Sequence, residues 1–277
     1  MEKTKQFFIS VKMYQKKYAK AFLEKGQIKF STPQSWVEYG KKYGDGRGDC
    51  LEGTIACFNN LDFENKISIL KKYEFYNNKN NLIKMKCGNR IYIKIKRDMQ
   101  LPCFCLYYLK TEMFNCPAKT GVHKLKTSIP GSYFRAFADN ISREKAEMLP
   151  EEERPVLLVI NNYPEFKNRL INKLISMGVN SNEIIETLVT YYDFDQYGEM
   201  GWIDLDIESP LELVFKHIKF KDQNEGRFII NTKNEKTLLM LKEPIEIGPL
   251  DDICLICDKY LYEGVDVELT ANVVLEK

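Results

Sequence analysis

The chain has 277 residues, with 41 lysines and arginines against 39 aspartates and glutamates, so its net charge of +2 excludes a general electrostatic attraction to nucleic acid. It contains no run of about 18 apolar residues and begins without the apolar core of a signal peptide, so we expect a cytoplasmic protein with no membrane partner. The eight cysteines are then expected to be reduced, and the single Cys254-Leu-Ile-Cys257 pair is too small a ligand set to predict a metal site.

The N-terminal quarter alternates short strands with helices. Apolar spacing predicts an amphipathic helix over residues 14–25, and Gly26 suits the position after its end. Thr32 followed by Pro33 is typical of a helix start. Strand-like runs cover residues 6–13, 27–30 and 53–58, and a further helix is predicted over residues 61–73.

The middle of the chain carries the clearest hairpin signal. Apolar and basic residues alternate on both sides of Gly88-Asn89, which predicts two paired strands over residues 82–97. Their basic residues could form a ribbon made of Lys84, Lys86, Arg90, Lys94, Lys96 and Arg97. Such a ribbon is either a face that binds nucleic acid or protein, or a plain solvated face of the sheet. The nearly all-apolar run 102–108 predicts a buried central strand, and we expect residues 110–138 to be irregular.

The second half of the chain also alternates predicted strands with predicted helices. Strands are predicted over residues 156–160, 188–192, 253–262 and 265–275, with helices over residues 142–149 and 162–177. This order predicts an α+β fold, with mixed or mainly antiparallel sheets and several flanking helices. A charged connection at residues 151–154 marks a soft boundary between halves 1–150 and 151–277, which pack closely or form one domain.

The first candidate site lies in a predicted hairpin or strand pair over residues 219–230. Glu225 and Arg227 are two positions apart on one strand, so their side chains point to the same face. There the carboxylate and the guanidinium can form an ordinary ion pair on a solvated face, or together bind a polar ligand or take part in catalysis.

The second candidate site is the glycine-rich segment 43–53. Its glycines permit a tight loop or a close approach to a ligand, and the loop presents Arg47, Asp49 and Glu52. The segment matches neither a Walker loop nor a dinucleotide-binding loop. A surface turn without a ligand is the simpler alternative.

Several loose motifs together resemble a family of uncharacterised bacterial and phage proteins that occur on mobile elements. In chain order, the motifs are Gly26-x-Ile28-x-Phe30 with Pro33, Asp49-x-x-Glu52, the strand Phe104-Cys105-Leu106, Gln223-x-Glu225-x-Arg227, and Ile247-Gly248-x-Leu250-x-Asp252-Ile253. The resemblance covers most of the chain. It implies a role in phage–host conflict, with a host or phage-defence protein complex as the partner and a homo-oligomer as a compatible assembly.

Part of this layout is also similar to that of ADP-ribosyltransferases. That similarity implies NAD as the cofactor and Glu225 as the catalytic carboxylate, with Arg227 or Arg47 on the pyrophosphate and Tyr14 or Trp36 stacked on nicotinamide. The first strand carries no His-Tyr or Arg motif, and no Ser-Thr-Ser block precedes Glu225.

The sequence is therefore compatible with two hypotheses about function. The first is a protein without a cofactor that binds and inhibits, or senses, a defence or host complex. The second is a NAD-dependent transferase. A metal-dependent nuclease built on Asp45, Asp49, Glu52 and Glu225 has less support, because the acidic-plus-lysine pattern of such enzymes is not recognisable. We favour the binding reading, because residue types and spacing do not assemble a complete catalytic constellation.

Overall fold

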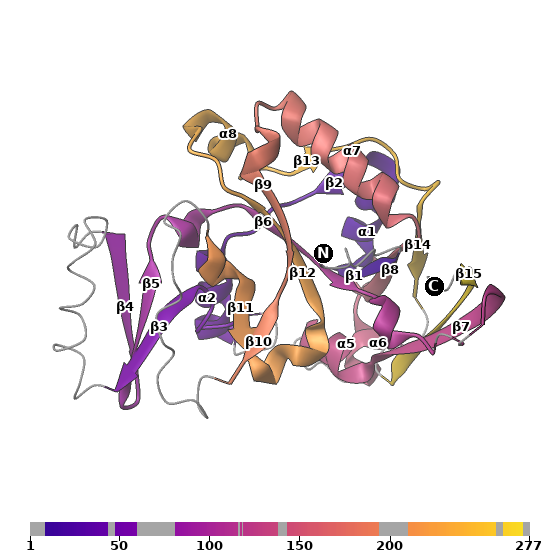
Figure 1. Cartoon of the computed structure of the whole chain (residues 1–277), viewed down its shortest axis with the longest axis horizontal. Helices are drawn as coiled ribbons and strands as arrows, with labels where there is room; N and C mark the ends of the chain where they lie inside the picture. Colours follow the sequence, from indigo (N-terminus) through magenta and orange to yellow (C-terminus); the bar gives the residue numbers. More distant parts are fainter. Residues whose placement is uncertain are drawn as a thin grey trace. The chain divides into compact units, whose positions relative to one another are not determined.

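The structure is a computed structural model that describes residues 9–43, 48–59, 81–115, 117, 119–137, 143–193, 210–258 and 263–273. It has an α+β fold with mostly antiparallel open sheets, as the sequence predicts (Figure 1). Contacts divide the chain into two units, each with segments from both sides of residue 150. The first unit is Met1–Ile28, Leu106–Lys173 and Ile245–Lys277, and the second is Lys29–Cys105 and Leu174–Pro244.

The first unit is built around strand β1, which pairs antiparallel with β8 and with the end of β6. Strand β14 adds to the other edge of β8. Its strands are β1 (Ser10–Gln15), β2 (Gln27–Ile28), β7 (Gly121–Pro130), β8 (Pro155–Ile160), β13 (Ile245–Glu246), β14 (Cys254–Cys257) and β15 (Gly264–Val273), with the second half of β6 (Cys103–Tyr108). Its helices are α1 (Lys16–Lys25), α5 (Gly131–Phe137), α6 (Arg143–Met148) and most of α7 (Tyr163–Ser176), with short 3-10 turns at Thr111–Met113 and Glu151–Glu153.

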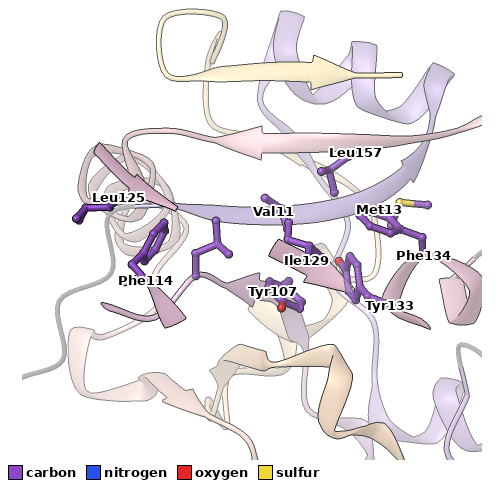
Figure 2. Close-up of a cluster of buried hydrophobic side chains, with 10 residues drawn as sticks. Val11, Met13, Tyr107, Phe114, Leu125, Ile129, Tyr133, Phe134 and Leu157 are labelled. Carbon is purple, nitrogen blue, oxygen red and sulfur yellow. The ribbon is translucent and has the colours of Figure 1, made fainter. Parts of the chain in front are cut away.

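A cluster of buried apolar side chains forms a core of this unit, and Figure 2 shows how these side chains converge between the strands. Val11 and Met13 come from the same face of β1, and the rings of Tyr107 and Tyr133 lie 4.7 Å apart in an edge-on contact. The expectation that residues 110–138 are irregular is wrong. Strand β7 and helix α5 occupy much of this range, because the alternating residues of β7 pair with β15, which is distant in the sequence.

The second unit contains a three-stranded sheet, a parallel strand pair and a third strand group. The orders are β3-β5-β4, β10-β11, and β6-β12-β9, and residues 103–105 of β6 belong to this unit. Its strands are β3 (Thr54–Asn59), β4 (Leu82–Cys87), β5 (Arg90–Ile95), β9 (Ile184–Leu188), β10 (Thr190–Tyr192), β11 (Phe215–His217) and β12 (Glu225–Ile230). Its helices are α2 (Pro33–Tyr43) and α8 (Glu235–Met240), with 3-10 helices η2 (Asp98–Gln100), η5 (Ser181–Glu183), η6 (Leu211–Val214) and η7 (Ile218–Gln223).

The hairpin over residues 82–97 is confirmed, since β4 and β5 pair antiparallel across Gly88-Asn89. The basic ribbon is only partly correct. Lys84 and Lys86 are exposed, but Lys94 is almost fully buried and its Nζ donates a hydrogen bond to the Cys50 carbonyl oxygen at 2.6 Å. Lys94 lies on the opposite side of the pleat from the exposed lysines, in a part of β5 that is buried on both faces.

The hairpin expected over residues 219–230 is wrong in its first half. Lys219 and Lys221 lie in the 3-10 helix η7, and Asn224, with a φ of 36°, makes the turn into β12. Strand β12 itself is confirmed, but it pairs antiparallel with β9. Every residue of β12 is buried, so both faces of this strand lie in the interior.

The predicted helix over residues 61–73 lies outside the described residues. Within the described part of the chain, no helix is both long and apolar enough to span a membrane.

Candidate functional site: a buried cluster of charged side chains

The site centres on the pleat of β12, which places Glu225 and Arg227 on one face. Arg227 Nε donates to Glu225 Oε1 at 2.6 Å, which confirms the same-face pair predicted from the sequence. The solvated-face alternative is wrong, because Arg227 has 0% and Glu225 7% of its surface exposed. An ion pair this deep is screened little by water, so losing either partner leaves an uncompensated buried charge.

Arg227 also joins the two candidate sites. Its Nη1 donates at 2.5 Å to both Glu52 Oε1 and the carbonyl oxygen of Leu213. Its guanidinium carbon lies 5.0 Å from the centroid of the Trp36 ring, within the range of a cation–π interaction. The glycine-rich segment, helix α2, η6 and β12 therefore meet at one side chain.

The second oxygen of Glu225 is held by a lysine that the sequence analysis missed. Lys216 Nζ lies 2.8 Å from Glu225 Oε2 and 2.7 Å from Gln223 Oε1, and it also sits over the Phe220 ring. The hydroxyl oxygen of Tyr191 accepts the Glu225 backbone N–H at 2.9 Å. Strands β10 and β11 pair Tyr191 with Lys216, so one strand pair supplies both groups.

A close contact between backbones positions the second carboxylate. A Cβ atom on Gly48 would lie 2.2 Å from the Gly40 backbone nitrogen and 2.6 Å from the Trp36 carbonyl oxygen. Glycine at position 48 thus lets the loop lie directly on α2. Just beyond it, Asp49 Oδ1 accepts the Leu51 N–H at 2.9 Å, a local turn that leads to the buried Glu52.

Six buried ionisable residues make up this site, which we call the charged cluster. They are three acidic and three basic residues, namely Asp49, Glu52, Glu225, Lys94, Lys216 and Arg227. Their formal charges balance when all six are ionised, which limits the cost of burying them together.

Burial and neighbouring charges shift the cluster's ionisation in different directions. Burial alone would raise the pKa of Glu225, but the charges of Arg227 and Lys216 hold it far below the usual value. Burial prevails at Glu52, whose pKa is raised despite Arg227 and Lys216. Burial lowers the pKa of Lys94 to about 8, against the charges of Glu52 and Asp49. Glu225 is therefore firmly ionised in the folded protein.

Three buried atoms of the cluster have no hydrogen-bond partner in the part of the chain that the structure describes. They are Asp49 Oδ2, Glu52 Oε2 and Arg227 Nη2. Glu52 and Arg227 are joined through their other atoms, at Oε1 and Nη1.

The remaining predicted site residues are distributed differently. Trp36 contacts the Arg227 guanidinium, whereas Tyr14 belongs to the first unit, where its ring packs against Phe22 at 5.9 Å. Arg47 and Asp45 lie outside the described residues. Among those described, no group of three or more histidine, cysteine, aspartate or glutamate side chains is arranged to hold a metal ion.

Lys94 and Lys216 are the members that sequence reasoning missed as site residues. Lys216 is a single charge inside the apolar run Leu213-Val-Phe-Lys-His, and a lone charge in such a run is a signal for a buried partner. Lys94 gave no comparable signal, because the alternation of its hairpin fits a solvated face equally well.

No protein-family model, no curated protein and no solved structure matches this chain.

Proposed function

We propose that this protein acts by binding another protein, and that the charged cluster stabilises the second unit without carrying out a reaction. The observation that carries this proposal is that both carboxylate oxygens of Glu225 are already occupied by ion pairs within the protein. Each of its carboxylate oxygens is held by a cation, Oε1 by Arg227 at 2.6 Å and Oε2 by Lys216 at 2.8 Å.

A transferase would use these residues differently. A carboxylate that stabilises a developing oxocarbenium ion must face the substrate, and an arginine that binds pyrophosphate must present its paired N–H groups to the ligand. Here Arg227 is fully buried, with Nε on Glu225 and Nη1 on Glu52 and Leu213. These contacts suit a residue that holds chain segments together, which supports the binding reading.

The class of partner follows from the resemblance to proteins of mobile elements. We infer a partner in phage–host conflict, either a host complex or a defence complex that this protein inhibits or senses. A NAD-dependent ADP-ribosyltransferase with Glu225 as its catalytic carboxylate is the alternative, and the same experiment distinguishes the two.

The test measures nicotinamide release from NAD, and transfer of labelled ADP-ribose to host lysate, by the native protein and by Glu225→Gln. Glu268→Gln is the matched control, because Glu268 is an exposed carboxylate that pairs with Lys124 and Lys126. In parallel, the native protein captures partners from lysate, and the purified partner is titrated against it by calorimetry.

Binding predicts no nicotinamide release above background from any of the three proteins, and a saturable complex with the purified partner. Release by the native and Glu268→Gln proteins, but not by folded Glu225→Gln, would overturn the proposal and establish the transferase.

A further inference from the structure

A second pair of buried ionisable groups lies outside the charged cluster. Asp98 begins the 3-10 helix η2 and Glu212 lies in η6, and each has only 1% of its surface exposed. The two carboxyl groups are within hydrogen-bonding reach of one another.

The hydrogen bonds of this pair are incomplete if both groups are ionised. Asp98 Oδ1 accepts from Arg97 Nε at 2.5 Å. Asp98 Oδ2 and both oxygens of Glu212 are buried with no donor in the described part of the chain. Two ionised carboxylates can only accept, so they cannot satisfy one another, and leaving such atoms unpaired in the interior is costly. Arg97 offsets one negative charge of the pair.

A single proton satisfies two of these three unpaired oxygens, one on each carboxyl group. Bound to Glu212, it turns one carboxylate into a hydrogen-bond donor that reaches the unpaired oxygen of Asp98. It also reduces the charge of the pair to the one that Arg97 balances. We propose that Asp98 and Glu212 form a buried proton-binding site, which holds one proton in the folded protein at neutral pH and whose deprotonation loosens η6.

The electrostatic surroundings of Glu212 also favour its protonated form. Burial, followed by the hydrogen bond to Asp98 and its negative charge, raises the pKa of Glu212 well above the usual value, while Arg97 opposes this. Because the folded state then binds more protons than the unfolded state above the ordinary glutamate pKa, stability is complete below that pH. It falls as the pH rises through the folded pKa.

The elements that contact η2 and η6 are β11, β5, β3 and α2, and they carry further ionisable groups. On β11, Lys216 binds Gln223 and Glu225, and His217 Nδ1 accepts the Lys219 N–H. On β5, Lys94 donates to the Cys50 carbonyl. The remaining ionisable residues of α2, β3 and β5 are Glu38, Tyr39, Lys41, Lys42, Tyr43, Cys57, Arg90 and Tyr92.

The proton site connects to the charged cluster through the next residue. Leu213 accepts a hydrogen bond from Arg227 Nη1, and its buried side chain packs with Leu101, Cys103 and Ile229. Movement of η6 on deprotonation would therefore disturb the Arg227 contact.

The test compares the native protein with Glu212→Gln, whose amide can still donate to Asp98 but cannot titrate. Glu243→Gln, at an exposed position of the same unit, is the control. Infrared difference spectra at neutral pH detect the carbonyl stretch of a protonated carboxylic acid, and urea unfolding from pH 5 to 9 follows stability.

We expect a protonated carboxyl band in the native protein and in Glu243→Gln that is lost in Glu212→Gln. Between the ordinary glutamate pKa and the folded pKa of Glu212, the folding equilibrium constant of the native protein should fall as the pH rises, relative to that of Glu212→Gln. The fall should be at most about tenfold per pH unit, which is the slope for one proton. A native protein without this band at neutral pH, or equal pH slopes for the native and Glu212→Gln proteins, would overturn the proposal. Absence of the band from the native spectrum would overturn the proposal even if the variant does not fold.

Discussion

Two lysine–glutamate pairs of nearly equal length show how burial changes the value of one interaction. Lys216 Nζ lies 2.8 Å from Glu225, and Lys124 Nζ lies 2.9 Å from Glu268. The first pair is less than 10% exposed on both sides, whereas the lysine and glutamate of the second are 71% and 42% exposed. Water screens the second pair and compensates either partner if the other is lost.

We therefore predict that Lys216→Met lowers the free energy of unfolding by about 3 kcal/mol, because it leaves the Oε2 side of Glu225 buried without its cation. Lys124→Met should change this free energy by less than about 1 kcal/mol. Urea unfolding of both variants at neutral pH measures the difference. Equal losses in the two variants would mean that Glu225 has another compensating group.

The same residue predicts a response to acid. Because the folded pKa of Glu225 is lowered from 4.5, its stabilisation is present above that value and is lost as the pH falls through the folded pKa. Native stability should thus decline more steeply than that of Glu225→Gln as the pH drops below about 4.5. Unfolding midpoints measured from pH 2 to 6 give the two slopes, and parallel slopes would contradict an ionised, ion-paired Glu225.

For single residues, the sequence predicted which side chains share a face of a strand, but not whether that face is buried or solvated. The spacing of Glu225 and Arg227 on a strand is enough to place them together. It cannot distinguish a solvated face from a buried one, since that depends on Lys216 and Glu52, which approach from other segments.

Among the elements, the contact between α2 and the glycine-rich loop determines where Glu52 lies. Gly48 contacts the α2 backbone so closely that any side chain would collide with Gly40 and Trp36. Gly88, in the β4–β5 turn, has a φ of +58° but open space around its Cβ position. One glycine is required by close packing and the other by its backbone conformation.

We predict that Gly48→Ala destabilises the protein by more than about 2 kcal/mol, because backbone atoms cannot move aside as a flexible side chain could. Gly88→Ala should cost about 1 kcal/mol, the strain of a left-handed residue. Thermal unfolding compares the two. A smaller effect at Gly48 than at Gly88 would show that the loop can lift from α2 at little cost.

Elements with strong local patterns were predictable from the sequence. The helix ending at Gly26 and the hairpin at Gly88-Asn89 carry their signals within a few residues. Strand β7 was missed because its pairing with β15 spans more than 130 positions of sequence. The 3-10 helix η7 was read as a strand because Lys-Phe-Lys alternates over only three residues, too few to fix a period.

On the scale of the whole molecule, the chain passes more than once through each unit. In the first unit β1 pairs with β8, which joins Ser10–Gln15 to Pro155–Ile160. In the second, Glu52 meets Arg227. The composition and the mixed order of elements predicted the α+β class, but residue spacing carries no information about which distant segments pair.

This interleaving predicts that fragments 1–150 and 151–277 do not fold when expressed separately. Each fragment lacks the partner strands that bury its own apolar face, so its amide NMR spectrum should show the narrow dispersion of an unfolded chain. Co-expression of the two fragments should restore the dispersed spectrum of the intact protein. A dispersed spectrum from either fragment alone would contradict the division into these units.

If the charged cluster holds the second unit together, Glu225 is a structural residue and its removal must lower the stability of the protein. The most direct test is the free energy of unfolding of Glu225→Gln relative to the native protein at neutral pH. We predict a loss of about 3 kcal/mol, because Arg227 and Lys216 would remain buried without their carboxylate. Unchanged or increased stability, as expected when a strained catalytic residue is removed, would contradict the claim.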